Sequence, residues 1–242
     1  MCDLLTYIGK LMSLMRLSLP PSNFAGTHLG DPRNANVEWP PNLAELQFNQ
    51  TFPTSKAWWA EIACHWPSTL NSLIFRDCKY ISLLSLPRRY KTLGLRYKTF
   101  PQITSLRVDA IEAGCEMEIS LDLWVKAFPQ LRFLSVPYLS LELTVLSDFE
   151  PGGRLIPRIE QLELTPDAGE VENFSTYRTI SRYAATFPSL WQIRVHELYL
   201  EFDDVWADCQ DANTLLKNRV IEQNNVAGRV VHDPEEAGVS FF

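Results

Sequence analysis

Residues able to do chemistry are few in this 242-residue chain, and they form no catalytic arrangement that the sequence reveals. The four histidines, His28, His65, His196 and His232, have no second histidine or carboxylate at metal-ligand spacing on a predicted helix. The motifs G-x-S-x-G, H-E-x-x-H, the P-loop and G-x-G-x-x-G do not occur. We therefore expect no enzymatic activity, no bound metal and no cofactor.

Two other groupings of reactive residues have structural explanations. Cys64 precedes His65, but adjacent residues on a helix point in different directions and so make a poor nucleophile and base. A cluster of four aspartates is interpreted as the acidic start and solvated face of a helix, because no second acidic helix accompanies it. Its members are Asp203, Asp204, Asp208 and Asp211.

Composition and charge exclude several classes of protein. With 46% apolar residues the chain is expected to fold, and its net charge of −7 argues against nucleic acid as a partner. The five cysteines are scattered without a C-x-x-C pair, so neither a disulfide framework nor a zinc site is expected. No stretch of 18 uncharged apolar residues suggests a membrane span. These features predict a cytoplasmic or nuclear protein.

A repeated L-x-x-L-x-L kernel organises the chain. Successive kernels are about 20 to 31 residues apart, close to the spacing of leucine-rich repeats, except for one interval of 13 residues that is too short for a strand and its crossover. Either one kernel beside that interval is a chance match, or the chain is irregular there. The kernels begin at residues 14, 43, 70, 90, 103, 131, 159 and 190.

The segments around the kernels predict the fold class. Each kernel alternates apolar and other residues at its end, as a strand with one buried face does, and helix-like segments precede several kernels, at 55–64, 121–128 and 175–187. Helix, proline and strand thus recur along residues 1–242. We predict a single α/β domain of seven to eight irregular repeats, with a parallel sheet on its concave face and helices or irregular turns on its convex face.

Prolines mark the repeats. The chain has 16 prolines and 10 glycines, the reverse of average usage. Seven of the prolines precede a kernel, where they fix the backbone of the entering chain. These seven are Pro40, Pro67, Pro87, Pro101, Pro129, Pro157 and Pro188.

One kernel carries a more specific resemblance. Residues 70–82, L-N-S-L-I-F-R-D-C-K-Y-I-S, resemble the cysteine-containing repeat L-x-x-L-x-L-x-x-C-x-x-I-T of F-box proteins. The sequence pattern F-P-x-L-x-x-L-x-V is similar to the repeat halves of fungal F-box-like proteins. The resemblance covers about residues 4–242 and implies a leucine-rich-repeat horseshoe that recognises substrates for a ubiquitin ligase. No F-box is found, and Cys78 has no counterpart in the other kernels. A stand-alone repeat scaffold or signalling regulator is the alternative.

The two ends of the chain carry different expectations. An apolar helix face leads directly into the first kernel, so we expect an N-terminal capping domain or a partner chain there, or a chain that is a fragment. A helix over 203–224 is expected to cap the C-terminal end, stopping at Asn224 and Asn225. Short strands are expected at 228–231 and 239–242.

The concave face is the expected binding surface. In a repeat strand the kernel leucines point inward, so the residues that alternate with them line the opposite face. On an acidic chain, arginines beside apolar side chains have the composition of a protein interface. A polar face that is merely exposed to solvent is the simpler explanation. The candidate protein-binding residues are Ile74, Arg76, Arg96, Arg107, Phe133, Gln161, Glu163 and Arg194.

Overall fold

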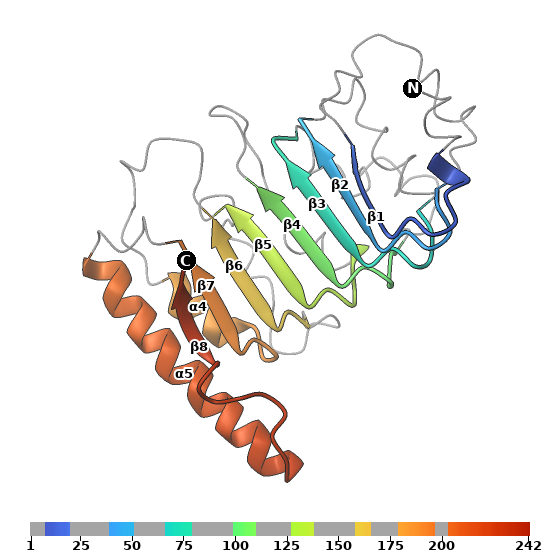
Figure 1. Cartoon of the computed structure of the whole chain (residues 1–242). Coiled ribbons are helices and arrows are strands. Elements are labelled where there is room, and N and C mark those ends of the chain that lie inside the picture. Colours follow the sequence, from blue (N-terminus) through green and yellow to red (C-terminus); the bar gives the residue numbers. More distant parts are fainter. Residues whose placement is uncertain are drawn as a thin grey trace, which may run out of the picture.

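The described residues form one open sheet of eight parallel strands that follow one another in chain order (Figure 1). The computed structural model describes residues 8–19, 39–50, 66–78, 99–109, 127–137, 158–165, 179–196 and 203–242. The strands are β1 (Arg16–Leu19), β2 (Glu45–Asn49), β3 (Ser72–Arg76), β4 (Ser105–Asp109), β5 (Phe133–Pro137), β6 (Gln161–Thr165), β7 (Gln192–Val195) and β8 (Gly238–Phe241).

Seven of the eight predicted kernels are confirmed as strands. Each of β1 to β7 begins two residues after the first position of its kernel. The kernel at residue 90 lies outside the described residues, but β3 pairs directly with β4 from Ser72 opposite Ser105 to Arg76 opposite Asp109. No strand therefore lies between β3 and β4. The short interval in the sequence is thus not a separate unit of the sheet.

The parallel register stacks the apolar kernel positions into rows on one side of the sheet. The second kernel leucines lie opposite one another from strand to strand, and the third positions form the next row. Because both rows are removed from water, the predicted alternation of inward and outward residues is confirmed. The buried rows contain Leu46, Leu73, Leu106, Leu134, Leu162 and Ile193, followed by Phe48, Phe75, Val108, Val136, Leu164 and Val195.

Where the structure describes the approach to a strand, a tight turn accounts for the proline there. In one form of the repeat, the amide of Ile103 donates to the carbonyl of Phe100 at 3.1 Å, and Pro101 occupies the turn position where its fixed φ fits. In the other form, the amide of Leu43 donates to the carbonyl of Pro40 itself, also at 3.1 Å. In this form the proline is the first residue of the turn and not the second. One more residue therefore separates the proline from the kernel in those copies.

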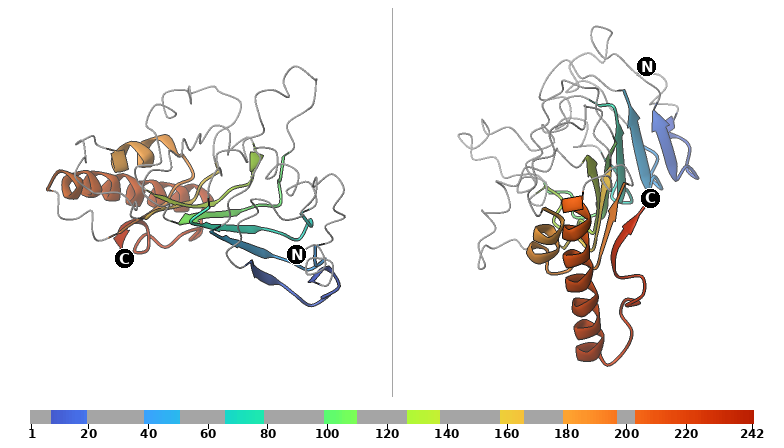
Figure 2. Two further views of the ribbon diagram at one scale, coloured as in Figure 1. Left: turned by 90° about the horizontal axis from the view of Figure 1, so that it is seen from above. Right: turned by 90° about the vertical axis from the view of Figure 1, so that its left-hand side faces the viewer.

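Two helices pack together on one side of the sheet at its C-terminal end (Figure 2). They are α4 (Thr179–Thr186), which lies within the predicted helix at 175–187, and α5 (Asp203–Ala227). The predicted helix at 55–64 and residues 121–126 of the one at 121–128 lie outside the described residues. None of the described helices is both long and apolar enough to cross a membrane.

The end of α5 differs from the prediction. The helix passes Asn224 and Asn225 and stops before Gly228, whose φ of +64° suits a residue that ends a helix. The side chain of Asn224 instead accepts hydrogen bonds from the amides of Val231 and His232 and donates to the carbonyl of His232. The asparagine therefore holds the returning chain rather than stopping the helix.

The C-terminal strand completes the sheet. The predicted strand at 239–242 is confirmed as β8, whereas the predicted strand at 228–231 is wrong because those residues form a turn and a bend. The amide of Val239 donates to Asn213 Oδ1 of α5 at 3.2 Å. Gly238, with φ +118°, brings the backbone so close to α5 that a Cβ atom there would overlap the Asn213 side chain. This contact fixes β8 against α5.

Candidate protein-binding face of the sheet

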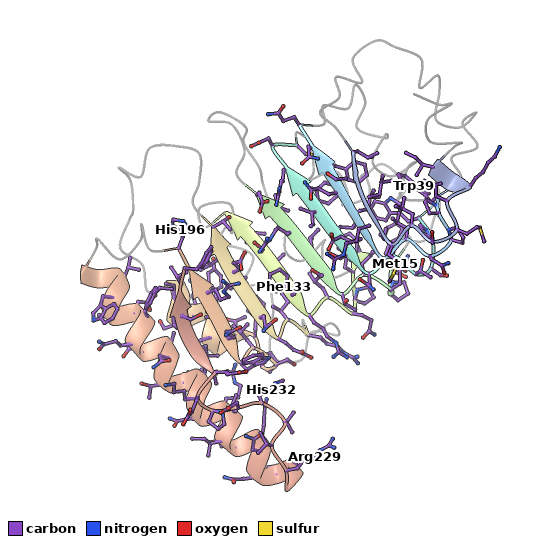
Figure 3. All side chains as sticks on the ribbon, viewed as in Figure 1. Met15, Trp39, Phe133, His196, Arg229 and His232 are labelled. Atoms are coloured by element: carbon purple, nitrogen blue, oxygen red, sulfur yellow. The ribbon has the colours of Figure 1, made fainter. Side chains whose placement is uncertain are left out.

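The face of the sheet opposite α4 and α5 carries the residues that alternate with the buried rows. No described helix covers this face, and we call it the open face; it is turned toward the viewer in Figure 3, where Phe133 is labelled. Seven of the eight predicted binding residues lie on it, and Arg96 lies outside the described residues. The seven are Ile74 and Arg76 (β3), Arg107 (β4), Phe133 (β5), Gln161 and Glu163 (β6) and Arg194 (β7).

Glu163 lies at the centre of a charged cluster on the open face. Its carboxylate accepts hydrogen bonds from Arg107 Nη2 at 2.5 Å, Arg194 Nη1 at 2.8 Å and Ser135 Oγ at 3.0 Å. These four residues face one another across β4, β5, β6 and β7 in register. Because serine is small, Arg107 reaches across β5 to a carboxylate two strands away.

The structure corrects the expectation that Glu163 is exposed. The residue is only 2% exposed, because the two arginines cover it, and Ser135 is fully buried beside it. Taking a carboxylate out of water is costly unless it is paired and hydrogen-bonded, and here both oxygens are used. Glu163 is therefore a buried support for the two arginines.

Two of the predicted arginines, Arg76 and Arg107, also share an acidic partner, Asp109. Arg76 Nε lies 2.8 Å from Asp109 Oδ2, and Arg107 Nε lies 3.9 Å from Asp109 Oδ1. The ion pairs thus run from β3 to β7. The side chains of Arg76, Arg107 and Arg194 are nevertheless 48%, 33% and 40% exposed, so these pairs add little stability and leave the guanidinium groups accessible.

The guanidinium groups of two arginines lie over aromatic rings. The guanidinium carbon of Arg107 lies 5.9 Å from the ring centre of Phe133, and that of Arg194 lies 4.8 Å from the ring centre of Phe242. His196 meets the same Phe242 ring edge-on at 5.3 Å. Such cation–π contacts restrict the motion of the long arginine side chains.

Sequence reasoning did not assign Phe242 a role on this face. The only signal is its position: β8 continues the alternation, so Phe241 points toward α5 and Phe242 toward the open face. The ring of Phe241 accordingly stacks on Trp206 of α5 at 5.8 Å. Phe241 therefore packs against α5, whereas Phe242 lies beside Arg194 on the open face.

The aspartate cluster on α5 is not a solvated face throughout. Asp208 is 5% exposed, and its carboxylate accepts hydrogen bonds from the amides of Ile180 and Ser181 at 2.7 and 3.2 Å and from the Ser181 hydroxyl. The interpretation as a solvated residue is thus wrong for Asp208. It caps the N-terminal end of α4, where a negative charge also suits the helix dipole.

Arg219 of α5 caps the C-terminal end of α4. Its guanidinium group donates to the carbonyls of Ala184, Phe187 and Leu190 at 2.6, 2.7 and 2.8 Å. Ala184 lies in the last turn of α4, whose carbonyls have no partner within the helix, and the Phe187 carbonyl also accepts a hydrogen bond from the amide of Leu190. Burial lowers the pKa of Arg219 somewhat, an effect that the nearby Glu222 opposes. One helix therefore caps both ends of its parallel neighbour.

The other reactive residues have packing roles where the structure describes them. The ring of His232 stacks on Trp191 at 4.8 Å, whereas His28, His65 and Cys64 lie outside the described residues. Burial, with a smaller effect of the Asp208 charge, raises the pKa of the Cys209 thiol to about 12, which keeps it protonated and unreactive. Within the described ranges, no three histidine, cysteine or acidic residues come together as metal ligands.

Cys78 contacts the backbone of two neighbouring strands. Its side chain is fully buried, with the sulfur 3.3 Å from the carbonyl of Arg76 and 3.5 Å from the carbonyl of Phe48. The thiol therefore contacts the backbone at the ends of two neighbouring strands, β3 and β2. A comparison of the sequence with models of known protein families finds no match, and no curated protein matches it.

Proposed function

We propose that the chain is a leucine-rich-repeat solenoid that binds another protein through the open face and has no catalytic role. The strands add one after another in chain order, and the same turn precedes those whose approach lies within the described residues; both features support the repeat assignment. The contact of Cys78 with the ends of two strands supports the kinship with the cysteine-containing repeat.

One observation carries the binding role. The open face displays a continuous set of partly exposed arginines that Glu163, Asp109 and two aromatic rings hold in place. Arginine and aromatic side chains are enriched at the centres of protein interfaces, and side chains that are already ordered lose less entropy when a partner binds. A face that is only solvated needs no such arrangement.

Charge reversal tests the proposed function. We expect the double variant Arg76→Glu and Arg107→Glu to abolish capture of the partner that the wild-type chain retains from a native extract. The expected loss is large, because each substitution places a carboxylate beside Asp109 or Glu163 where a guanidinium group contacts the partner. The measurement is quantitative mass spectrometry of the captured proteins.

The matched control is Arg229→Glu, which changes an exposed charge beyond the end of α5 (Figure 3). This variant should retain the partner. Both variants are first compared with the wild type by thermal melting, so that loss of capture is not loss of folding. Equal capture by the double variant and the wild type would contradict binding through the open face.

We further propose that the binding serves substrate recognition by an F-box-type ubiquitin ligase in the cytoplasm or nucleus, with a stand-alone scaffold as the alternative. The support is the resemblance of residues 70–82. The N-terminal end of the sheet also supports a covering domain or partner chain, since Leu11, Met12 and Met15 beside β1 are 50%, 65% and 61% exposed. Co-purification of the complete gene product with the ligase adaptor subunit separates the two settings.

A further inference from the structure

We propose that Arg107 and Arg194 together receive a carboxylate side chain of the partner, so that the partner docks with an acidic segment. This inference rests on the proposed function and specifies the chemistry of the partner. The receiving site consists of the two guanidinium groups around Glu163, and we call it the Glu163 site. Arg76 provides a further positive charge beside it, through Asp109.

The Glu163 site has more hydrogen-bond donors than acceptors. Each guanidinium group carries five N–H donors. Among the described residues, Arg107 and Arg194 each donate a single hydrogen bond, and both go to Glu163. The two Glu163 oxygens are already engaged, one of them also by Ser135. An incoming acceptor therefore finds free donors on both arginines, and a donor on the partner finds little to bind.

The local charge favours an anion. Three arginines, Arg76, Arg107 and Arg194, share two carboxylates, Asp109 and Glu163, so the ion-paired cluster carries 3 − 2 = +1 on a chain whose net charge is −7. The rest of the molecule repels an acidic segment, which confines its docking to this cluster. One carboxylate neutralises the surplus.

The local surplus of one positive charge also favours a carboxylate over a phosphate group. A phosphorylated side chain carries about −1.5 to −2 charges at neutral pH, which exceeds the local surplus of +1. Because its charge is larger, the carboxylate of Glu163, which is hydrogen-bonded to both arginines, repels it more strongly than it repels a carboxylate. The described part of the open face offers no further cation at this point to compensate that repulsion.

The geometry lets one carboxylate contact both arginines. Arg107 and Arg194 start from β4 and β7, three strands apart, but their guanidinium groups meet at the same carboxylate, at 2.5 and 2.8 Å. The rings of Phe133 and Phe242 contact the guanidinium groups of Arg107 and Arg194, respectively. An acceptor above Glu163 can therefore take a hydrogen bond from each arginine, which is stronger and more directional than contact with one charge alone.

Binding of defined peptides to the intact chain tests the inference. The probe is a fluorescein-labelled decapeptide of alternating aspartate and glycine, and its matched forms carry asparagine or phosphoserine in place of aspartate. Fluorescence anisotropy at low salt should show binding of the aspartate peptide, no binding of the asparagine peptide, and weaker binding of the phosphoserine peptide. Arg107→Gln or Arg194→Gln should each lower the affinity about tenfold.

Controls separate the possible outcomes. Arg229→Gln should change the affinity less than about twofold, since it alters net charge equally without touching the Glu163 site. The inference would be overturned if the aspartate peptide did not bind, if the asparagine peptide bound equally well, or if the phosphoserine peptide bound more tightly than the aspartate peptide. It would also be overturned if neither Arg107→Gln nor Arg194→Gln changed the affinity. If the inference fails in one of these ways while Arg76→Glu with Arg107→Glu still abolishes partner capture, the proposed function stands without it.

Discussion

Replacing Phe75 by alanine should lower the free energy of unfolding by about 4 kcal/mol, the cost typical of removing a buried aromatic side chain. Phe75 is fully buried, and its ring stacks on Phe48 of the neighbouring strand with 5.5 Å between centres and an angle of 6°. The substitution removes this ring contact and leaves a cavity between two repeats. Thermal melting should show a transition lower by about 8–16 °C.

The preceding residue provides a matched control for Phe75. Ile74 belongs to the same strand but lies on the open face, so Ile74→Ala should cost less than about 1 kcal/mol. Phe75→Leu should fall between the two, since leucine fills part of the space. Similar costs at positions 74 and 75 would contradict the register that places successive residues on opposite faces of the sheet.

Asp208→Ala should lower the free energy of unfolding by about 3 kcal/mol. The substitution leaves the amides of Ile180 and Ser181 without their acceptor at a buried helix end. It also removes a negative charge from the positive end of α4. Urea denaturation followed by circular dichroism measures the change.

Three further variants test whether α5 caps α4 in this way. Asp208→Asn keeps an acceptor oxygen but loses the charge, so its cost should be smaller than that of Asp208→Ala. Arg219→Ala removes the donor for three carbonyls at the other end of α4 and should also be destabilising. Gln210→Ala, at an exposed position of the same helix, should change stability by less than about 0.5 kcal/mol. A cost for Asp208→Ala no larger than that control would contradict the capping role.

The sheet was predictable because the information for it is local. Each kernel places its apolar residues at alternate positions, and its proline marks the turn that precedes the strand, as at Pro101 before β4. Parallel pairing in chain order follows from repetition, since every unit presents the same edge to the next. The kernel at residue 90 shows the limit of this reasoning: three correctly spaced apolar residues do not insert a strand between β3 and β4.

The charged partners could not be read from the sequence because they are distant along the chain. Arg107 and Glu163 are 56 residues apart, and Asp208 caps an amide 28 residues before it. Alternation places Glu163 on the open face correctly, but only the neighbouring side chains decide whether it is exposed or covered. Asp208 has the same local context as an exposed helical aspartate, so nothing in its surroundings along the chain indicates that it is buried.

Site-specific crosslinking tests the binding role of the open face most directly. A photo-reactive benzoylphenylalanine replaces Phe133, which lies on the open face beneath Arg107, or Val226, which is 91% exposed on α5. We predict that position 133 crosslinks to the captured partner, that Arg107→Glu removes this crosslink, and that position 226 gives none. Crosslinks from position 226 alone, or crosslinks from position 133 that persist with Arg107→Glu, would contradict binding through the open face.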